Sequence, residues 1–317
     1  MIMAERVAMI GSGIIGRAFA ICFSRGGYEV TLYDPKDGAA EAAIPLMRET
    51  VADLEQNGLL NDRTTDDVMS RMIPVKSMEG AVEGAIHVQE NAPEVLELKR
   101  ELFTKLDKIA PKDAVLASSS SSIVTSKFTE GLEGRHRCMI VHPTNPPYVV
   151  TILELVPAPW TDPEVTQKTR ERLEAMGMSP ITLHKEITGF IMNRFQSPIL
   201  QEAFRLVAMG VVSPADVDKA MSEGISQRWS FIGPLEVGDL NAPNGFKEYA
   251  EKYEAMNRNI AMEQRDLVPW AGPLLDYIDK SFRERVPMDQ HKARQQWRDR
   301  RLMALAVHKK WANENIK

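Results

Sequence analysis

A histidine and a glutamate stand twelve residues apart in the stretch CMIVHPTNPPYVVTILELVP, residues 138–157. His142 ends one apolar run, and Glu154 lies in the middle of the next. An ionised carboxylate among apolar residues is costly unless a partner compensates its charge. An imidazole is such a partner, because a carboxylate at one ring nitrogen fixes the tautomer and makes the other nitrogen a better base. The pair therefore predicts proton abstraction from a substrate hydroxyl; a solvent-facing Glu154 on an edge strand is the alternative.

Metal binding is a further alternative for the histidine. His136 and His142 are six residues apart, a spacing that matches no standard zinc site, and the sequence has no CxxC or HExxH. The two cysteines, Cys22 and Cys138, lie in apolar surroundings, which predicts buried thiols in a reducing compartment. We therefore expect no metal.

A glycine turn, GSGIIG, follows the apolar run RVAMI near the start of the chain. Gly11 allows the tight turn, Gly13 lets the backbone approach a pyrophosphate, and Gly16 lets the following helix pack on the strand. The pyrophosphate of a dinucleotide then lies at the amino terminus of that helix. The intervening Ile14 and Ile15 complete the predicted contact with the cofactor.

An acidic residue, Asp34, closes the next apolar run 18 residues after Gly16. A carboxylate at this position accepts hydrogen bonds from the adenosine ribose and repels a 2′-phosphate. No arginine follows it directly, so the sequence predicts NAD and not NADP as the cofactor. The alternative is a structural glycine turn next to a solvated aspartate.

The elements that carry these residues predict an α/β fold with a Rossmann-like dinucleotide-binding domain. Strands are expected at 6–10, 28–34, 71–75, 84–90, 113–118, 137–142 and 151–156, with two inserted helices between 38 and 71 and a helix that begins at Pro93. From residue 188 the pattern is helical, and Ser213 and Pro214 are typical of a helix start. We expect an NAD-binding domain at 1–187 and an all-helical domain at 188–317 for substrate binding and dimerisation.

The crevice of a parallel sheet lies beyond the carboxyl ends of its strands. His142 ends one predicted strand and the serine run 118–122 ends the preceding one, so both are expected at the nicotinamide end of the cofactor.

Composition excludes several partners. The chain has 317 residues, 44% hydrophobic and 26% charged, with a formal net charge of -5. A mild negative charge argues against nucleic acid or an anionic membrane as the main partner. No apolar run reaches 20 residues, and the apolar start breaks at charged residues and glycines, so we expect a cytoplasmic protein without a signal or membrane segment.

These motifs resemble the 3-hydroxyacyl-CoA dehydrogenase superfamily. The resemblance covers nearly the whole chain and includes the glycine turn, HPTNPP, the glutamate twelve residues after the histidine, TGFIMNR and FIGPLE. It implies a Rossmann-like domain with an inserted helical hairpin, a helical C-terminal domain and a homodimer. It is closest to the L-gulonate 3-dehydrogenase branch, through SEGISQRWSFIGPLE and RQQWRDRRLMALA among others.

The resemblance also implies roles for individual residues. His142 and Glu154 form the catalytic dyad, and Ser121 and Asn193 contact the reacting oxygen of the substrate. The remaining cofactor contacts correspond to Asn91, Glu94, Lys99 and Asn145.

The substrate is open between a small hydroxy acid and a CoA thioester. Arg228, in SQRWSF, could hold a substrate carboxylate, or it could form a structural ion pair. Residues 38–80 contain few cations for CoA phosphates. Both features favour NAD-dependent oxidation of a small 3-hydroxy acid, as implied by the L-gulonate likeness. L-carnitine and 3-hydroxyacyl-CoA dehydrogenases remain alternatives.

Two further classes are less favoured by the residues. A non-catalytic dinucleotide binder or crystallin-like structural protein would not need His142, Glu154, Ser121 and Asn193. A 6-phosphogluconate-type dehydrogenase would need a lysine in the helical domain, and none occurs between Lys185 and Lys219.

Overall fold

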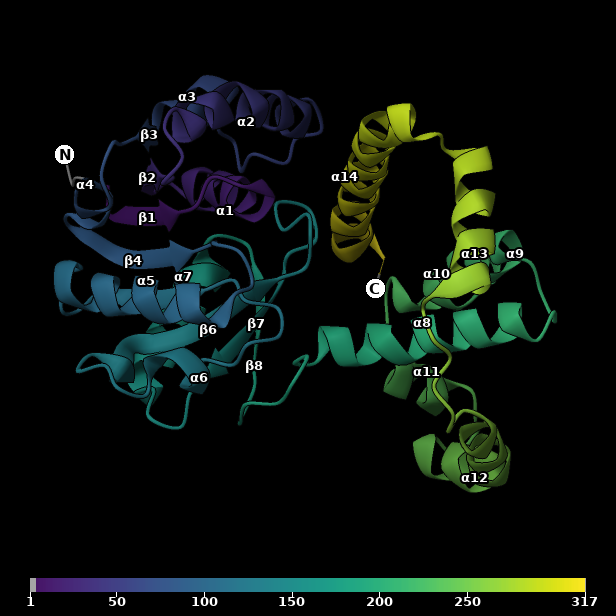
Figure 1. Ribbon diagram of the computed structural model, residues 1–317. Helices are drawn as coiled ribbons and strands as arrows, with labels where there is room; N and C mark the ends of the chain where they lie inside the picture. The colour runs from purple at the N-terminus through teal and green to yellow at the C-terminus, as the bar shows by residue number, and fades with distance from the viewer. Residues whose placement is uncertain (1–3, 317) are drawn as a thin grey trace. The chain divides into compact units, whose positions relative to one another are not determined.

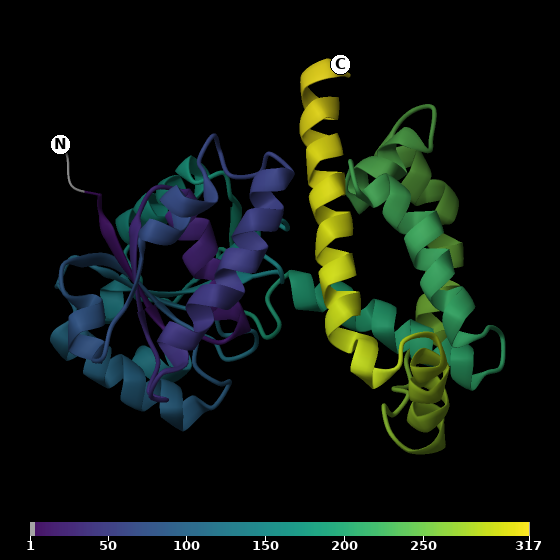
Figure 2. The same ribbon diagram turned by 90° about the horizontal axis from the view of Figure 1, so that it is seen from above.

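The computed structural model describes residues 4–316, which divide into two compact units. The first unit comprises Met1–Asn193 and Gln295–Lys317, and the second comprises Arg194–Arg294. The last helix of the chain, from Gln295 on, is therefore assigned to the same unit as the sheet, whereas the sequence placed all of 188–317 in one helical domain. Figures 1 and 2 show this helix in yellow, ending at the C-terminus.

The first unit is built on one eight-stranded sheet of order β3-β2-β1-β4-β5-β6-β7-β8. The strands are β1 (Arg6–Ile10), β2 (Glu29–Tyr33), β3 (Met72–Pro74), β4 (Ala85–Glu90), β5 (Val115–Ser118), β6 (Cys138–Pro143), β7 (Ile152–Pro157) and β8 (Ser179–Thr182). The order reverses between β1 and β4, the position where ligands of such sheets bind. The predicted α/β Rossmann-like fold is confirmed.

Both faces of the sheet are buried, which explains the continuous apolar runs. Val7 and Met9 of β1 belong to one hydrophobic cluster, and Ala8 and Ile10 belong to another. Successive side chains of a strand point to opposite faces, so helices must cover both sides.

The covering helices of the first unit are α1 (Ile14–Arg25), α2 (Ala39–Gln56), α3 (Thr65–Ser70), α4 (Met78–Val82), α5 (Leu96–Ile109), α6 (Ser126–Thr129) and α7 (Pro163–Ala175), with a short 3₁₀ turn at Arg135–Arg137. The two inserted helices expected between 38 and 71 are α2 and α3. The helix expected to begin at Pro93 begins at Leu96 instead, so that prediction was wrong. The backbone of Val95 is extended, and its N–H donates to the Pro93 carbonyl, which makes 91–95 a turn before the helix.

The strand pair β6–β7 is the one antiparallel pair within the described sheet. Eight residues, 144–151, connect the two strands. This connection is too short for the crossover that a parallel pair requires, so β7 returns alongside β6. Beyond β7 lies β8, so Glu154 is not on an edge strand.

The second unit is helical throughout its described part. It contains most of α8 (Met192–Ala208), then α9 (Pro214–Lys219), a π-helical turn (Ala220–Ile225), α10 (Ser226–Trp229), α11 (Pro234–Leu240), α12 (Phe246–Glu263), α13 (Gly272–Arg285), a 3₁₀ turn (Met288–Gln290) and the start of α14 (His291–Asn315). Ser213 caps α9 as expected, accepting a hydrogen bond from the Asp216 N–H. Across residues 4–316, no helix has the length and apolar character needed to span a membrane.

A buried histidine, His87, lies in the core of the sheet. Its Nε2–H donates to the Gln89 side chain at 3.0 Å, and its Nδ1 has no partner among the described residues. Burial, followed by the positive charge of Arg172, lowers the pKa of His87 from 6.5 to about 3. The folded protein therefore holds His87 neutral.

His87 makes the stability of the protein depend on pH. Its folded pKa lies below its unfolded value, so the unfolded chain binds the extra proton below pH 6.5, and stability falls as pH drops from 6.5 toward 3. Between pH 7 and pH 5 this single group accounts for about 2 kcal/mol of the free energy of unfolding. Urea unfolding of the wild type and His87→Leu at both pH values measures it. On going from pH 7 to pH 5, the free energy of unfolding of the variant should fall by about 2 kcal/mol less than that of the wild type. Equal decreases in the two proteins would show that His87 does not titrate in this way.

Candidate active site

His142 and Glu154 lie directly opposite each other in the β6–β7 pair. The Nδ1 of His142 is 2.7 Å from Oε2 of Glu154, and the two residues are 7% and 1% exposed. Because a carboxylate can only accept, Nδ1 carries the proton, and Nε2 has no partner among residues 4–316. The spacing of twelve residues is thus the result of a hairpin that brings the two side chains together.

The second oxygen of Glu154 is also held in place. Its Oε1 accepts hydrogen bonds from the backbone N–H groups of Ile191 at 2.6 Å and Met192 at 3.1 Å, at the start of α8. Burial raises the pKa of Glu154, but the bonds from His142 and these two N–H groups outweigh it, so its pKa lies below the usual value. The carboxylate therefore stays ionised and orients the imidazole.

The segment before α8 shapes this contact. Phe190 has φ of +49°, and its ring meets the His142 imidazole edge-on at 5.3 Å between centroids. Positive φ is uncommon for a bulky residue. Here it turns the chain so that α8 begins at Met192 and not at Thr188, where the helical pattern starts, and the first N–H groups point at Glu154.

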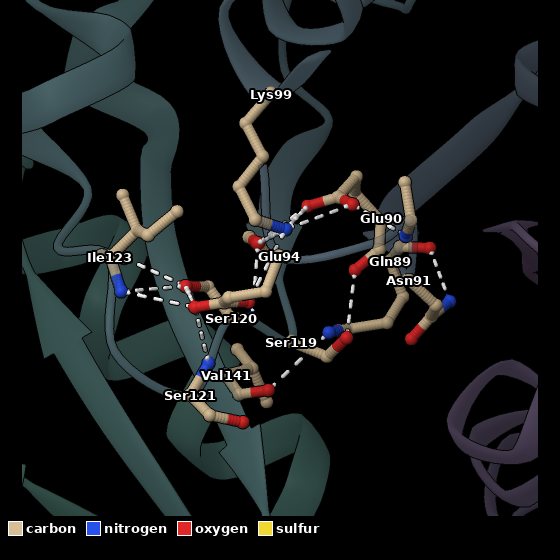
Figure 3. Close-up of polar contacts among 12 residues, drawn as sticks. Gln89, Glu90, Asn91, Glu94, Lys99, Ser119, Ser120, Ser121, Ile123 and Val141 are labelled. Atoms are coloured by element: carbon tan, nitrogen blue, oxygen red, sulfur yellow. Dashed lines mark hydrogen bonds and ion pairs between the residues drawn. The ribbon is translucent and has the colours of Figure 1, made fainter. Parts of the chain in front are cut away.

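A carboxylate from another element, Glu94, organises the serine loop after β5. Its Oε1 accepts from the Ser120 hydroxyl at 2.6 Å, from the hydroxyl of Ser122 at 3.0 Å, and from the N–H groups of Ser121, Ser122 and Ile123 at 2.9–3.1 Å (Figure 3). Burial raises the pKa of Glu94, but these hydrogen bonds outweigh burial, so the pKa lies below its usual value. Glu94 fixes the position of Ser121.

Ser121 and Asn193 are brought together. The side-chain amide of Asn193 donates to the Ser121 carbonyl at 3.0 Å, although 72 residues separate them. The Ser121 side chain is exposed. The structure therefore places these two predicted substrate contacts beside each other.

Lys99 is fully buried, and its amine faces protein groups. It donates to both carboxylate oxygens of Glu90, at 3.0 and 3.2 Å, and lies 3.9 Å from Glu94 (Figure 3). Ser118 donates to the same Glu90 carboxylate at 2.5 Å. These contacts tie the ends of β4 and β5 to α5, beneath the serine loop.

The glycine turn has the geometry that a dinucleotide requires. A Cβ at Gly16 would lie 1.9 Å from the Gly11 carbonyl oxygen, so only glycine fits there. Gly11 has φ of +99°, and a Cβ there would lie 3.0 Å from the backbone carbonyl oxygen of Asn91. A Cβ at Gly13 would meet nothing within 4 Å, which leaves open space at the amino terminus of α1 for the pyrophosphate. Ile14 is 62% exposed beside this opening.

Asp34 directly follows β2 and is held in place by hydrogen bonds. Its Oδ2 accepts from the Ser12 N–H and hydroxyl at 2.8 and 2.9 Å, and its Oδ1 accepts from the Lys36 N–H at 3.0 Å. Burial raises the pKa of Asp34, and the hydrogen bonds outweigh this effect, so the pKa is lowered. The carboxylate is therefore ionised at neutral pH.

A cavity of about 570 Å³ adjoins Asp34 and the glycine turn. Most of its lining is apolar, contributed by Met78, Pro93, Leu98 and Leu102 among others. The side-chain oxygen of Asn91, another lining residue, is buried without a partner in the described chain. An apolar slot with an acid at one end and an unused acceptor fits an adenosine, so the residues present suit NAD.

The remaining predicted residues are placed as follows. Asn145 is exposed three residues after His142, and its side chain has no partner among residues 4–316. Ile15 is half-buried in the first turn of α1. Arg228 is exposed on α10 in the second unit and forms no ion pair with a described residue.

Sequence reasoning missed Glu90, Ser12 and Phe190. Glu90 closes the apolar run of β4, and a carboxylate at the carboxyl end of a buried strand was the signal that could have found it. Ser12 stands inside the glycine motif, but its partner Asp34 lies 22 residues away. No local signal indicates the turn at Phe190.

The chain matches two family models in succession. The NAD-binding domain of 3-hydroxyacyl-CoA dehydrogenase matches residues 6–187, and the C-terminal domain of the same enzyme matches residues 189–270. This chain belongs to the 3-hydroxyacyl-CoA dehydrogenase family. It is therefore an NAD-dependent oxidoreductase of that family.

Relatives within the family extend over most of the chain. It is 38% identical to lambda-crystallin of Oryctolagus cuniculus over 310 residues, which is 97% of each chain. It is 36% identical to an L-carnitine dehydrogenase of Streptomyces griseus over 231 residues, 73% of this chain and 68% of the relative.

A solved structure resembles the fold as a whole. The FHMPC 5-dehydrogenase, described as an NAD⁺-dependent dismutase, has a TM-score of 0.80 and 26% identity, covering 96% of this chain and 97% of the other. The likeness thus extends over both the sheet unit and the helical unit.

Proposed function

We propose that this chain oxidises the 3-hydroxyl of a small free hydroxy acid, and by resemblance converts L-gulonate to 3-dehydro-L-gulonate. The observation that carries the reaction type is the buried 2.7 Å contact between His142 and Glu154. It leaves Nε2 of the imidazole as the base for the substrate hydroxyl. NAD, when bound, supplies the acceptor for the hydride.

The chain's own groups have separate tasks in this proposal. His142 takes the hydroxyl proton as the C–H bond breaks, and Glu154 stabilises the imidazolium that forms. Ser121 and Asn193 position the reacting oxygen, while Glu94 keeps the serine loop in place. Asp34, Asn91, the glycine turn and Asn145 bind and orient the cofactor. Lys99 holds the carboxylates of Glu90 and Glu94 in place through its buried amine.

The ion pairs of the inserted helices support a free acid over a CoA thioester. Between residues 38 and 80 the chain has four cations, and each is already paired with a carboxylate. The pairs are Arg48–Asp66 at 2.8 Å, Arg63–Asp67 at 2.8 Å, Arg71–Asp67 at 2.9 Å and Lys76–Glu41 at 2.5 Å. No unpaired cation is left there for the phosphates of CoA.

Arg228 is our candidate for the substrate carboxylate. A guanidinium binds a carboxylate with two parallel hydrogen bonds, and no described carboxylate is paired with Arg228. This role rests on its chemistry and its lack of an ion pair.

A substrate panel tests the function. NADH formation is measured with L-gulonate, L-carnitine and 3-hydroxybutyryl-CoA, using the wild type, Arg228→Met and the control Arg265→Met. We expect turnover of L-gulonate, and a KM for it about 100-fold higher in Arg228→Met, in line with the loss of a charge-assisted pair. Turnover of the CoA ester alone would refute the free-acid proposal, and turnover of carnitine alone would move the chain to that branch.

We also propose that the second unit forms a homodimer. Its described surface exposes large apolar side chains, including Phe195, Met209, Phe231, Leu235 and Leu267, the last 82% exposed. Exposed apolar side chains of this size are candidates for burial between subunits. Light scattering on the protein as it elutes from a size-exclusion column should give twice the chain mass of 35.6 kDa. A mass equal to one chain would refute the dimer.

A further inference from the structure

A second cavity, of about 720 Å³, lies in the first unit, away from the residues assigned to the cofactor and the dyad. It is lined by the carboxyl end of α1, the segment 58–61, the loop between β6 and β7, and the later turns of α14. Three cations line it, Arg25, Lys309 and Lys310, and no aspartate or glutamate does.

Arg25 carries a charge in this wall without a counter-ion. The residue is 6% exposed. Its Nη1 donates to the carbonyls of Leu59 at 3.2 Å and Tyr148 at 2.8 Å, while its Nε is buried without a partner. Nη2 makes no hydrogen bond to any described residue. Burying a guanidinium without an anion is costly, so the site is incomplete as it stands.

Two exposed lysines add positive charge to this wall. Lys309 and Lys310 form no hydrogen bond or ion pair with residues 4–316. Two acids at the earlier turns of α14 are already paired, Asp53 with Arg300 at 3.0 Å and Asp299 with Arg298 at 2.7 Å.

Direct hydrogen bonds connect the elements that form the wall of this cavity. Tyr148 donates its hydroxyl to Asp299 of α14 at 2.9 Å, and its carbonyl accepts from Arg25. Leu302, Ala306, Lys309 and Asn313 recur at three- and four-residue steps, so one face of α14 closes the cavity.

We propose that this cavity binds a compact di- or trianion of carboxylate or phosphate chemistry. Arg25 offers the planar donor Nη2, and Lys309 and Lys310 supply point charges from α14. A bound anion would join α14 to the loop between β6 and β7. It would contact the two lysines of α14 and Arg25, and Arg25 already donates to the Tyr148 carbonyl in that loop. The site is independent of the proposed substrate.

Calorimetry on the full chain tests the proposal. The protein is saturated with NAD and titrated with inorganic phosphate or citrate, against sodium chloride of equal ionic strength. We expect saturable binding of at least one probe at one site per chain, weakened about tenfold or more in the double variant Lys309→Gln, Lys310→Gln. The control double variant Lys280→Gln, Lys292→Gln removes the same charge outside the cavity and should bind as the wild type does.

The outcomes separate the sources of any binding. Binding of phosphate alone supports a tetrahedral oxyanion, and binding of citrate alone supports a polycarboxylate. No saturable heat with either probe overturns the proposal, and so does binding that the lysine variant leaves unchanged. Binding lost in Arg228→Met, or seen only without NAD, also overturns it, because the anion would then occupy the substrate or cofactor site.

Discussion

Replacing His142 by alanine is expected to lower kcat by about 10²- to 10⁴-fold, the contribution of a positioned general base. The reason is that Nε2 of His142 has no partner among the described residues, whereas Nδ1 is bonded to Glu154 at 2.7 Å. A loss of 10³-fold corresponds to about 4 kcal/mol of transition-state stabilisation. Steady-state NADH formation at saturating NAD and hydroxy acid measures it.

The control for this variant is His136→Ala. His136 is exposed in the 3₁₀ turn before β6, and its removal should leave kcat within about twofold of the wild type, as expected for a surface change. NAD binding, followed by protein fluorescence, should be unchanged in both variants. A His142→Ala enzyme with wild-type kcat would refute the assignment of His142 as the base. That result would not bear on the proposed anion site, which does not include His142.

Replacing Glu154 by glutamine is expected to lower kcat by about 10³-fold, with the fold preserved. The amide keeps the shape of the carboxylate, so its oxygen can still accept from the N–H groups of Ile191 and Met192. Its other end is then a donor, which requires His142 to accept at Nδ1 and to carry the proton at Nε2. That tautomer cannot take a proton from the substrate.

The pH dependence distinguishes this effect from simple unfolding. The pKa of Glu154 is lowered in the folded protein, so the stability that this carboxylate contributes is present above its unfolded pKa and is lost as pH falls through the lower folded value. The glutamine variant has no carboxylate to titrate at this position, so it lacks this loss of stability at acidic pH. Thermal unfolding at pH 7 should show a folded variant, and Glu133→Gln, exposed before β6, serves as the matched control. An active, folded Glu154→Gln enzyme would contradict the orienting role.

Much of the fold could be predicted because its signals are local. The continuous apolar runs of β1 and β4 indicate strands buried on both faces, and Gly11, Gly13 and Gly16 have backbone requirements that their neighbours alone explain. Pro93 misled because proline is common both at a helix start and in the turn before one. The first residues of α8 were missed because positive φ at Phe190 has no sequence signal.

The sequence by itself determined which residues could do chemistry: a histidine at a strand end, a carboxylate that burial would penalise, and a glycine turn followed by Asp34. Only the tertiary structure decided what each of them touches. The register of β6 and β7 brings His142 against Glu154, and Glu94 bonds a loop that starts 26 residues later. Lys99 is buried against Glu90, and α14 forms the wall of a cation-lined cavity with Arg25. These contacts join residues distant in the chain, so their partners are set by packing and strand register, which local propensity does not encode.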